Sequence, residues 1–223
     1  MANREFNPWK TIWSHPRETF SALLEDGKTE RALIIISALR GILYLFPFLF
    51  LALLGRLNSP VTAFLLILVC GAAIGYIASW IGAFFLWLAS RLFSSTAPIN
   101  NYRVVCVWAQ LPSILLDVLV LSFAFIQTLI LSQAGSPPSP LVQTGLAYIE
   151  LIALLTSIYF GLSILIRGLA FLDKSSKWRA VALLVVAFLI YLSIVLACFF
   201  LFQAFSAMPM MQAAPMAAPS ITA

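Results

Sequence analysis

Charge is what this sequence has least of. Only 9% of its 223 residues are Asp, Glu, Lys or Arg, against about 25% in soluble domains, and 62% are hydrophobic. Histidine occurs once, at His15, and three cysteines (Cys70, Cys106 and Cys198) fall in apolar runs without metal-ligand or disulfide spacing. This composition excludes an ordinary soluble domain and gives no reason to expect a metal ion, a disulfide or another cofactor.

Sequence motifs of known chemistry are also missing. The chain has no GxxxxGKS/T phosphate loop, no GxGxxG after a strand, no HExxH and no GxSxG. No nucleophile stands in a pattern that supplies it with a base. No basic stretch is interleaved with aromatics in the way that nucleic-acid binding needs. We therefore expect neither an enzyme nor a nucleic-acid-binding protein.

Long apolar runs are what the sequence has instead. They cover about 32–54, 61–90, 103–132, 141–167 and 179–205. Each is long enough for a bilayer, which about 20 apolar residues cross as a helix. The stretches between them are rich in Pro, Ser, Asn or charge, as loops are. The sequence therefore predicts an all-α fold, a polytopic transmembrane bundle of five helices over 32–205, followed by a disordered Ala-, Pro- and Met-rich tail over 206–223.

The N-terminal segment, residues 1–31, mixes aromatic and basic side chains. This pattern is typical of an amphipathic helix that lies in the membrane interface. We expect Trp9, Trp13 and Phe20 to insert among the lipids. Lys10 and Arg17 would then face the headgroups.

Lys and Arg fall almost entirely on one side of the predicted membrane. With a cytoplasmic N-terminus, the opposite side holds only Arg56. The cytoplasmic side then holds Arg4, Lys10, Arg17, Lys28, Arg31, Arg91, Arg103, Arg167, Lys174, Lys177 and Arg179. Because cytoplasmic loops carry the excess of Lys and Arg, this asymmetry predicts a cytoplasmic N-terminus and an extracytoplasmic C-terminus.

Three ionisable residues interrupt the apolar runs: Arg40, Asp117 and Glu150. Each costs roughly 2.5–3.5 kcal/mol at the centre of a bilayer, so these side chains must turn inward. Helical spacing places further polar groups on the same faces. The predicted intramembrane cluster is therefore Arg40, Asp117, Glu150, Tyr44, Gln110, Ser113 and Ser157.

The cluster has two interpretations. It is either a buried ion pair that fixes helix register, with Arg40 contacting Asp117 and Glu150 close by, or a proton or ion relay. A transporter usually repeats broken helices around its site, and no such repeat is visible, which favours the structural interpretation. The third run, 103–132, is expected to be one helix with a kink at Pro112, because proline lacks the N–H of the helical ladder.

The second run contains small residues at four-residue intervals, which allow helix backbones to approach closely. They are Gly71, Gly75, Ser79 and Ala83. This ladder predicts either packing within the chain or homodimerisation through the same face.

Three segments give the chain a family resemblance. They are NPWKTIWSHPRETFSALL at 7–24, NNYRVVCVWAQLPSILL at 100–116 and RGLAFLDKSSKWRAVALLVV at 167–186. Over about 7–203 the chain resembles the Yip-domain integral membrane proteins, relatives of the eukaryotic Yip factors that interact with Rab GTPases. It is similar to short prokaryotic members, because eukaryotic ones carry a longer cytoplasmic N-terminal region.

The resemblance implies five spans, a cytoplasmic N-terminus and no catalytic residues. Eukaryotic members are implicated in Rab GTPase binding, vesicle trafficking and membrane shaping, so a GTPase partner is implied only if that role carries over. We expect a non-enzymatic protein of a prokaryotic cytoplasmic membrane that organises the bilayer or binds another membrane protein or a second copy of itself. The alternative is a small proton- or ion-coupled transporter or channel that uses Arg40, Asp117 and Glu150.

Overall fold

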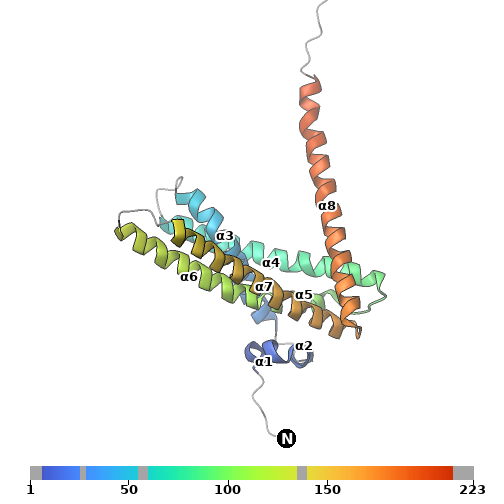
Figure 1. Cartoon of the computed structure of the whole chain (residues 1–223). Helices are drawn as coiled ribbons and strands as arrows, with labels where there is room; N and C mark the ends of the chain where they lie inside the picture. Colours follow the sequence, from blue (N-terminus) through green and yellow to red (C-terminus); the bar gives the residue numbers. More distant parts are fainter. Residues whose placement is uncertain (1–6, 26–28, 55–59, 135–139, 213–223) are drawn as a thin grey trace, which may run out of the picture.

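Prolines begin four of the helices in this all-α protein, because the first helical position needs no N–H donor. The computed structural model describes the backbone of residues 7–25, 29–54, 60–134 and 140–212, and this part of the chain holds eight helices and no strand (Figure 1). They are α1 (Pro8–Ser14), α2 (Pro16–Glu25), α3 (Glu30–Leu54), α4 (Pro60–Leu92), α5 (Ile99–Trp108), α6 (Leu111–Ala134), α7 (Pro140–Leu172) and α8 (Lys177–Gln212).

Several helical stretches are long and apolar enough to cross a membrane. Within the described residues there are four, Phe64–Leu92, Ile99–Ser122, Ala147–Leu172 and Lys177–Phe200. They coincide with the second to fifth predicted runs, which confirms a multi-pass helical protein. The first run coincides with α3, whose side chains beyond Phe46 lie outside the described residues. The number of five spans therefore stays a prediction.

Helices α3 and α4 touch backbone to backbone. A Cβ on Gly41 would lie 2.5 Å from the backbone nitrogen of Gly75 and closer still to the carbonyl oxygen of Gly71. No other residue fits at such contacts, because any side chain would push the two helices apart. The ladder Gly71, Gly75, Ser79 and Ala83 thus packs α4 within the chain, and α3 occupies the face that homodimerisation through the two glycines would need.

The third apolar run forms two helices, α5 and α6, separated by a turn at Ala109 and Gln110. Pro112 has no N–H to donate to the carbonyl oxygen of Trp108, so the helical ladder cannot continue through the turn. The N–H of Gln110 donates instead to the carbonyl oxygen of Val107 at 3.1 Å. The prediction of one kinked helix is therefore wrong.

The N-terminal segment forms two short helices that pack at one end of the bundle (Figure 1). His15 separates them, because a residue before proline avoids the helical conformation, and its φ is −130°. The ring of Phe20 is fully buried, with its Cε2 2.8 Å from the point where Gly168 of α7 would carry a Cβ. The expectation that Phe20 inserts among lipids is wrong, since the missing side chain of α7 leaves room for the ring inside the protein.

Helix α8 diverges from the other helices. Figure 1 shows its first turns beside the bundle and the rest standing away from it. One contact between α8 and α4 is made by Tyr191 and Phe85, whose rings meet edge to face with centroids 5.4 Å apart. The helix continues to Gln212, so the predicted disordered tail begins as helix, and residues 213–223 lie outside the described part.

Candidate functional site

Arg40 of α3 and Asp117 of α6 form an ion pair between Nη1 and Oδ2. The two residues are far apart in the sequence, and both interrupt apolar stretches, so each removes the other's uncompensated charge. Their side chains keep 31% and 39% of their surface exposed, so the pair lies at the side of the bundle and not in its centre. The contact joins α3 to α6.

A cavity of about 250 Å³ lies beside this pair. Asp117 and Val120 line it from α6, and Ala153 and Ser157 line it from α7. The carboxylate and the hydroxyl give an otherwise apolar cavity two groups that can hold a water molecule. Asp117 therefore faces both a cation and a small, largely apolar cavity.

The other residues of the predicted cluster lie on α3, on α7 and around the start of α6. Ser113 and Gly161 bring α6 and α7 together, since the serine oxygen lies 3.9 Å from where a Cβ on Gly161 would stand. Gln110 lies in the turn before α6, and Tyr44 is an exposed residue of α3 one turn beyond the arginine. The side chain of Glu150 lies outside the described residues.

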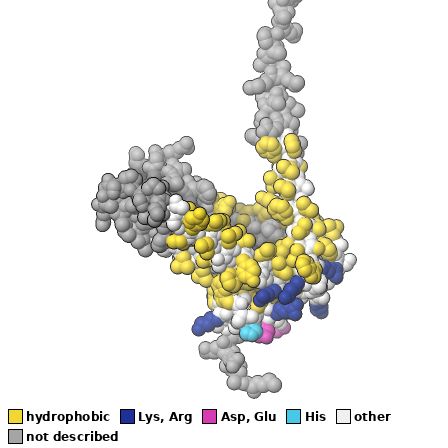
Figure 2. Space-filling model, in the orientation of Figure 1, with side chains coloured by type: hydrophobic (Ala, Val, Ile, Leu, Met, Phe, Trp, Pro, Cys, Tyr) yellow, Lys and Arg dark blue, Asp and Glu magenta, His cyan; other side chains and the backbone are white. Residues whose placement is uncertain are grey.

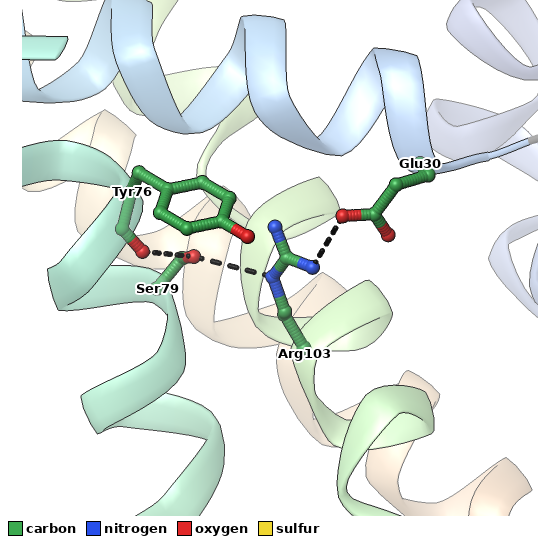
Figure 3. A network of polar contacts seen from close by, with 4 residues as sticks. All are labelled: Glu30, Tyr76, Ser79 and Arg103. Atoms are coloured by element: carbon green, nitrogen blue, oxygen red, sulfur yellow. Dashed lines mark hydrogen bonds and ion pairs between the residues drawn. The ribbon is translucent and has the colours of Figure 1, made fainter. Parts of the chain in front are cut away.

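Arg103 forms a second ion pair, at the junction of α3, α4 and α5 (Figure 3). Its Nη1 donates to Oε1 of Glu30 at 2.7 Å, and its Nε donates to the hydroxyl of Ser79 at 3.4 Å. The guanidinium carbon lies 4.4 Å from the ring centroid of Trp80 and 4.9 Å from that of Tyr76. Arg103 is 0% exposed, whereas 51% of the Glu30 side chain is exposed.

These contacts suit an arginine. A guanidinium is planar and weakly hydrated, so it can stack on aromatic faces while it donates in its own plane. Of the three guanidinium nitrogens, Nη2 has no hydrogen-bond partner among the described residues. Because arginine does not give up its proton in proteins, this group can neutralise charge and hold three helices together but cannot relay protons.

Arg103 was predicted to be one of the cations that face the cytoplasm. That prediction is wrong for its side chain, which is fully buried. The physical reason is that Glu30 and the two rings replace the water that a surface arginine would have. A signal was present in the sequence. One face of the second apolar run carries three side chains with polar groups, at the spacing i, i+3, i+4: Tyr76, Ser79 and Trp80. Such a polar face is unusual in an apolar run.

A third polar contact group ties the loop after α4 to the end of α7. The hydroxyls of Ser95 and Tyr102 both donate to Oδ1 of Asp173, at 2.6 and 2.7 Å. The two hydroxyl oxygens are also only 2.8 Å apart. No pattern in the sequence predicted this group, although Tyr102 and Asp173 fall within two of the segments that carry the family resemblance.

The predicted interfacial residues lie on α1 and α2. The ring centroids of Trp9 and Trp108 are 5.1 Å apart, and those of Trp13 and Phe160 are 6.2 Å apart. Both N-terminal tryptophans therefore contact the bundle with one part of the ring and remain exposed with another. The two predicted headgroup-facing cations are exposed: Lys10 and Arg17.

Figure 2 shows Lys and Arg side chains gathered at the end of the molecule next to the single histidine, with hydrophobic side chains covering the surface beyond them. We call this the basic end, formed by Arg17, Arg91, Arg167, Lys174, Lys177 and Arg179. Within the described residues, no three His, Cys, Asp or Glu side chains gather closely enough to hold a metal ion.

Apolar helices, internally paired charges and one basic end define a multi-pass integral membrane protein. The family model for the Yip1 domain matches residues 10–216, nearly the whole chain. The chain therefore belongs to the Yip1-domain family, which confirms the resemblance seen in the sequence. Searches of curated proteins and of solved structures gave no match.

Proposed function

We propose that this Yip1-domain protein is a non-enzymatic scaffold that organises the membrane by binding lipid and a second membrane protein, or another copy of itself. The observation that supports this proposal is the pairing of charges between helices of the same chain. Arg40 and Arg103 each have a carboxylate partner on another helix, and Arg103 is also held between two rings. Ion pairs of this kind favour a fixed arrangement of the helices over a pathway for a moving proton or ion.

In this proposal the basic end faces the cytoplasm of a prokaryotic cell. The gathering of its Lys and Arg side chains at one end supports this orientation, because cytoplasmic surfaces of membrane proteins are enriched in both residues.

A photo-crosslinking experiment tests the scaffold. A photoreactive residue replaces Leu92, which is exposed at the basic end, or Phe188, which is exposed on the side of α8. A protein partner docked at the basic end should give an adduct of one discrete mass from position 92. Position 188 is the matched control, and it should give lipid adducts only. Absence of a protein adduct from position 92 in intact cells would contradict a scaffold that works through this end.

The cavity beside Asp117 favours transport as a second candidate function. A carboxylate within an apolar helix, beside a cation and a cavity that can hold water, is a feature of proton pathways in membranes. Proteoliposomes containing a pH-sensitive dye separate the two candidates. A proton flux that Asp117→Asn abolishes would replace the scaffold by a transporter, whereas equal rates for both proteins and for empty vesicles would support the scaffold.

A further inference from the structure

Two hollows at the basic end share the same two cations. The first has a volume of about 410 Å³ and lies between α7 and α8. The second has a volume of about 370 Å³ and reaches the turn between α1 and α2. Arg167 of α7 and Lys177 of α8 line both of them, so the two hollows adjoin at these cations, and together we call them the groove.

The outer part of this groove is cationic. Arg17 joins Arg167 and Lys177 there, with Glu18 as the acidic lining residue and His15 beside it. Among the described residues, no carboxylate lies within ion-pair distance of these three cations. Arg40 and Arg103, by contrast, are each paired inside the chain. The groove therefore holds positive charge for which the described part of the protein supplies no partner.

The inner part of the groove is apolar and runs along α7. Leu162 and Ile166 line it from α7 and Val181 from α8. Tyr159 and Trp178 also line it, and both rings are largely exposed. Tyr and Trp favour the level of lipid headgroups, because their rings are apolar while their O–H and N–H groups are polar.

We propose that this groove binds one acidic phospholipid. Its phosphate lies between Arg167 and Lys177, within reach of Arg17, and one acyl chain lies along Leu162 and Ile166. Charge complementarity carries the choice of occupant. Basic pockets between membrane helices suit anionic headgroups, and an arginine can donate two parallel hydrogen bonds to a phosphate. A free phosphate would satisfy the cations but would leave the apolar half of the groove unused.

This proposal names a lipid site for the proposed scaffold, but its test can succeed if the scaffold function fails, because a transporter with the same groove would bind the same lipid. The test is native mass spectrometry of the full-length protein in detergent, titrated with phosphatidylglycerol or phosphatidylcholine. The wild-type protein should retain one phosphatidylglycerol in preference to phosphatidylcholine. Arg167→Gln with Lys177→Gln should lower that preference roughly tenfold or more. The reason is that each Lys or Arg near an anionic lipid adds to the affinity, and this variant lacks two of them.

The matched control is Arg31→Gln with Lys174→Gln, which removes the same charge from exposed positions outside both hollows. It should leave retention unchanged, and an equal loss in both double variants would overturn the proposal in favour of a diffuse basic surface. Leu162→Trp fills the apolar half and should also lower retention. Full retention by that variant, or complete displacement of the lipid by millimolar inorganic phosphate, would reduce the groove to a simple anion site and overturn lipid binding. Lys177→Gln alone serves if the double variant does not fold.

Discussion

Arg103 and Arg40 are both paired with carboxylates, but their surroundings differ. Arg103 is completely enclosed, and its partner Glu30 is half exposed. Arg40 and Asp117 are both partly exposed and lie next to a cavity. Removing a partner from a buried charge costs far more than removing one from a charge that can still be solvated. The consequences of mutation should therefore depend on which charge is left behind.

For the enclosed pair we predict an asymmetry between the two partners. Glu30→Ala leaves a buried guanidinium without a counter-charge and should lower the free energy of unfolding by about 3–5 kcal/mol. Arg103→Met leaves a half-exposed carboxylate that water can reach, so its cost should be smaller. Thermal unfolding of the full-length variants in one detergent measures both. Equal melting temperatures for the two variants would contradict the asymmetry, and melting temperatures equal to that of the parent would mean that the pair contributes little to stability.

For the partly exposed pair we predict partial compensation. Arg40→Leu and Asp117→Leu should each lower the free energy of unfolding by about 1–3 kcal/mol, because each leaves one charged group unpaired. The double variant should recover most of that loss, since no charge remains. Unfolding in detergent gives the stabilities. Additive losses in the double variant would show that the two residues do not stabilise the fold through each other.

At the scale of elements, the decisive contacts are places where a side chain is missing. Gly41 and Gly75 let α3 and α4 touch, and Gly168 makes room for the ring that anchors α2. Lipid tails are as apolar as the side chains of these helices, so the hydrophobic effect does not drive helices together in a membrane. Close backbone contacts of this kind therefore hold the helices at a fixed distance. A single added methyl group should therefore be felt at these positions.

The matched pair Gly75→Ala and Gly145→Ala tests this point. A Cβ on Gly75 would lie 2.8 Å from the backbone nitrogen of Gly41, whereas a Cβ on Gly145 would meet nothing within 4 Å. Overpacking should cost the first variant at least about 1–3 kcal/mol. The second should be neutral or slightly stabilised, because alanine favours the helix over glycine. If both variants unfold like the parent, α3 and α4 do not pack through these glycines.

At the scale of the whole molecule, charge is distributed by position. Apart from the paired Arg40 and Arg103, the Lys and Arg side chains seen in Figure 2 gather at one end, where α1 and α2 also pack (Figures 1 and 2). Helix α8 starts at that end and runs away from it (Figure 1). The two ends of α8 should therefore lie on opposite sides of the bilayer if the helix spans it.

Topology reporters test this arrangement. A reporter inserted between Asp173 and Lys177 should behave as cytoplasmic, and one fused after Ala223 should behave as extracytoplasmic, because the excess of Lys and Arg stays in the cytoplasm. A phosphatase and a fluorescent protein give opposite signals at each position, so every site carries its own control. A cytoplasmic signal after Ala223 would mean that the number of spans is even.

The sequence by itself determined the class of this protein, its all-α fold and the helices behind four of the five apolar runs. It did so because length and hydrophobicity are local properties that the bilayer imposes on each segment separately. Its polar spacing also pointed to the contact between Arg40 and Asp117, two residues that had no other reason to stand in apolar runs. Only the tertiary structure decided where the third run breaks, that Phe20 turns inward and that Arg103 is enclosed by Glu30, Tyr76 and Trp80. Those outcomes depend on which helices become neighbours. A charge at the edge of an apolar run looks the same in the sequence whether water, lipid or another helix covers it.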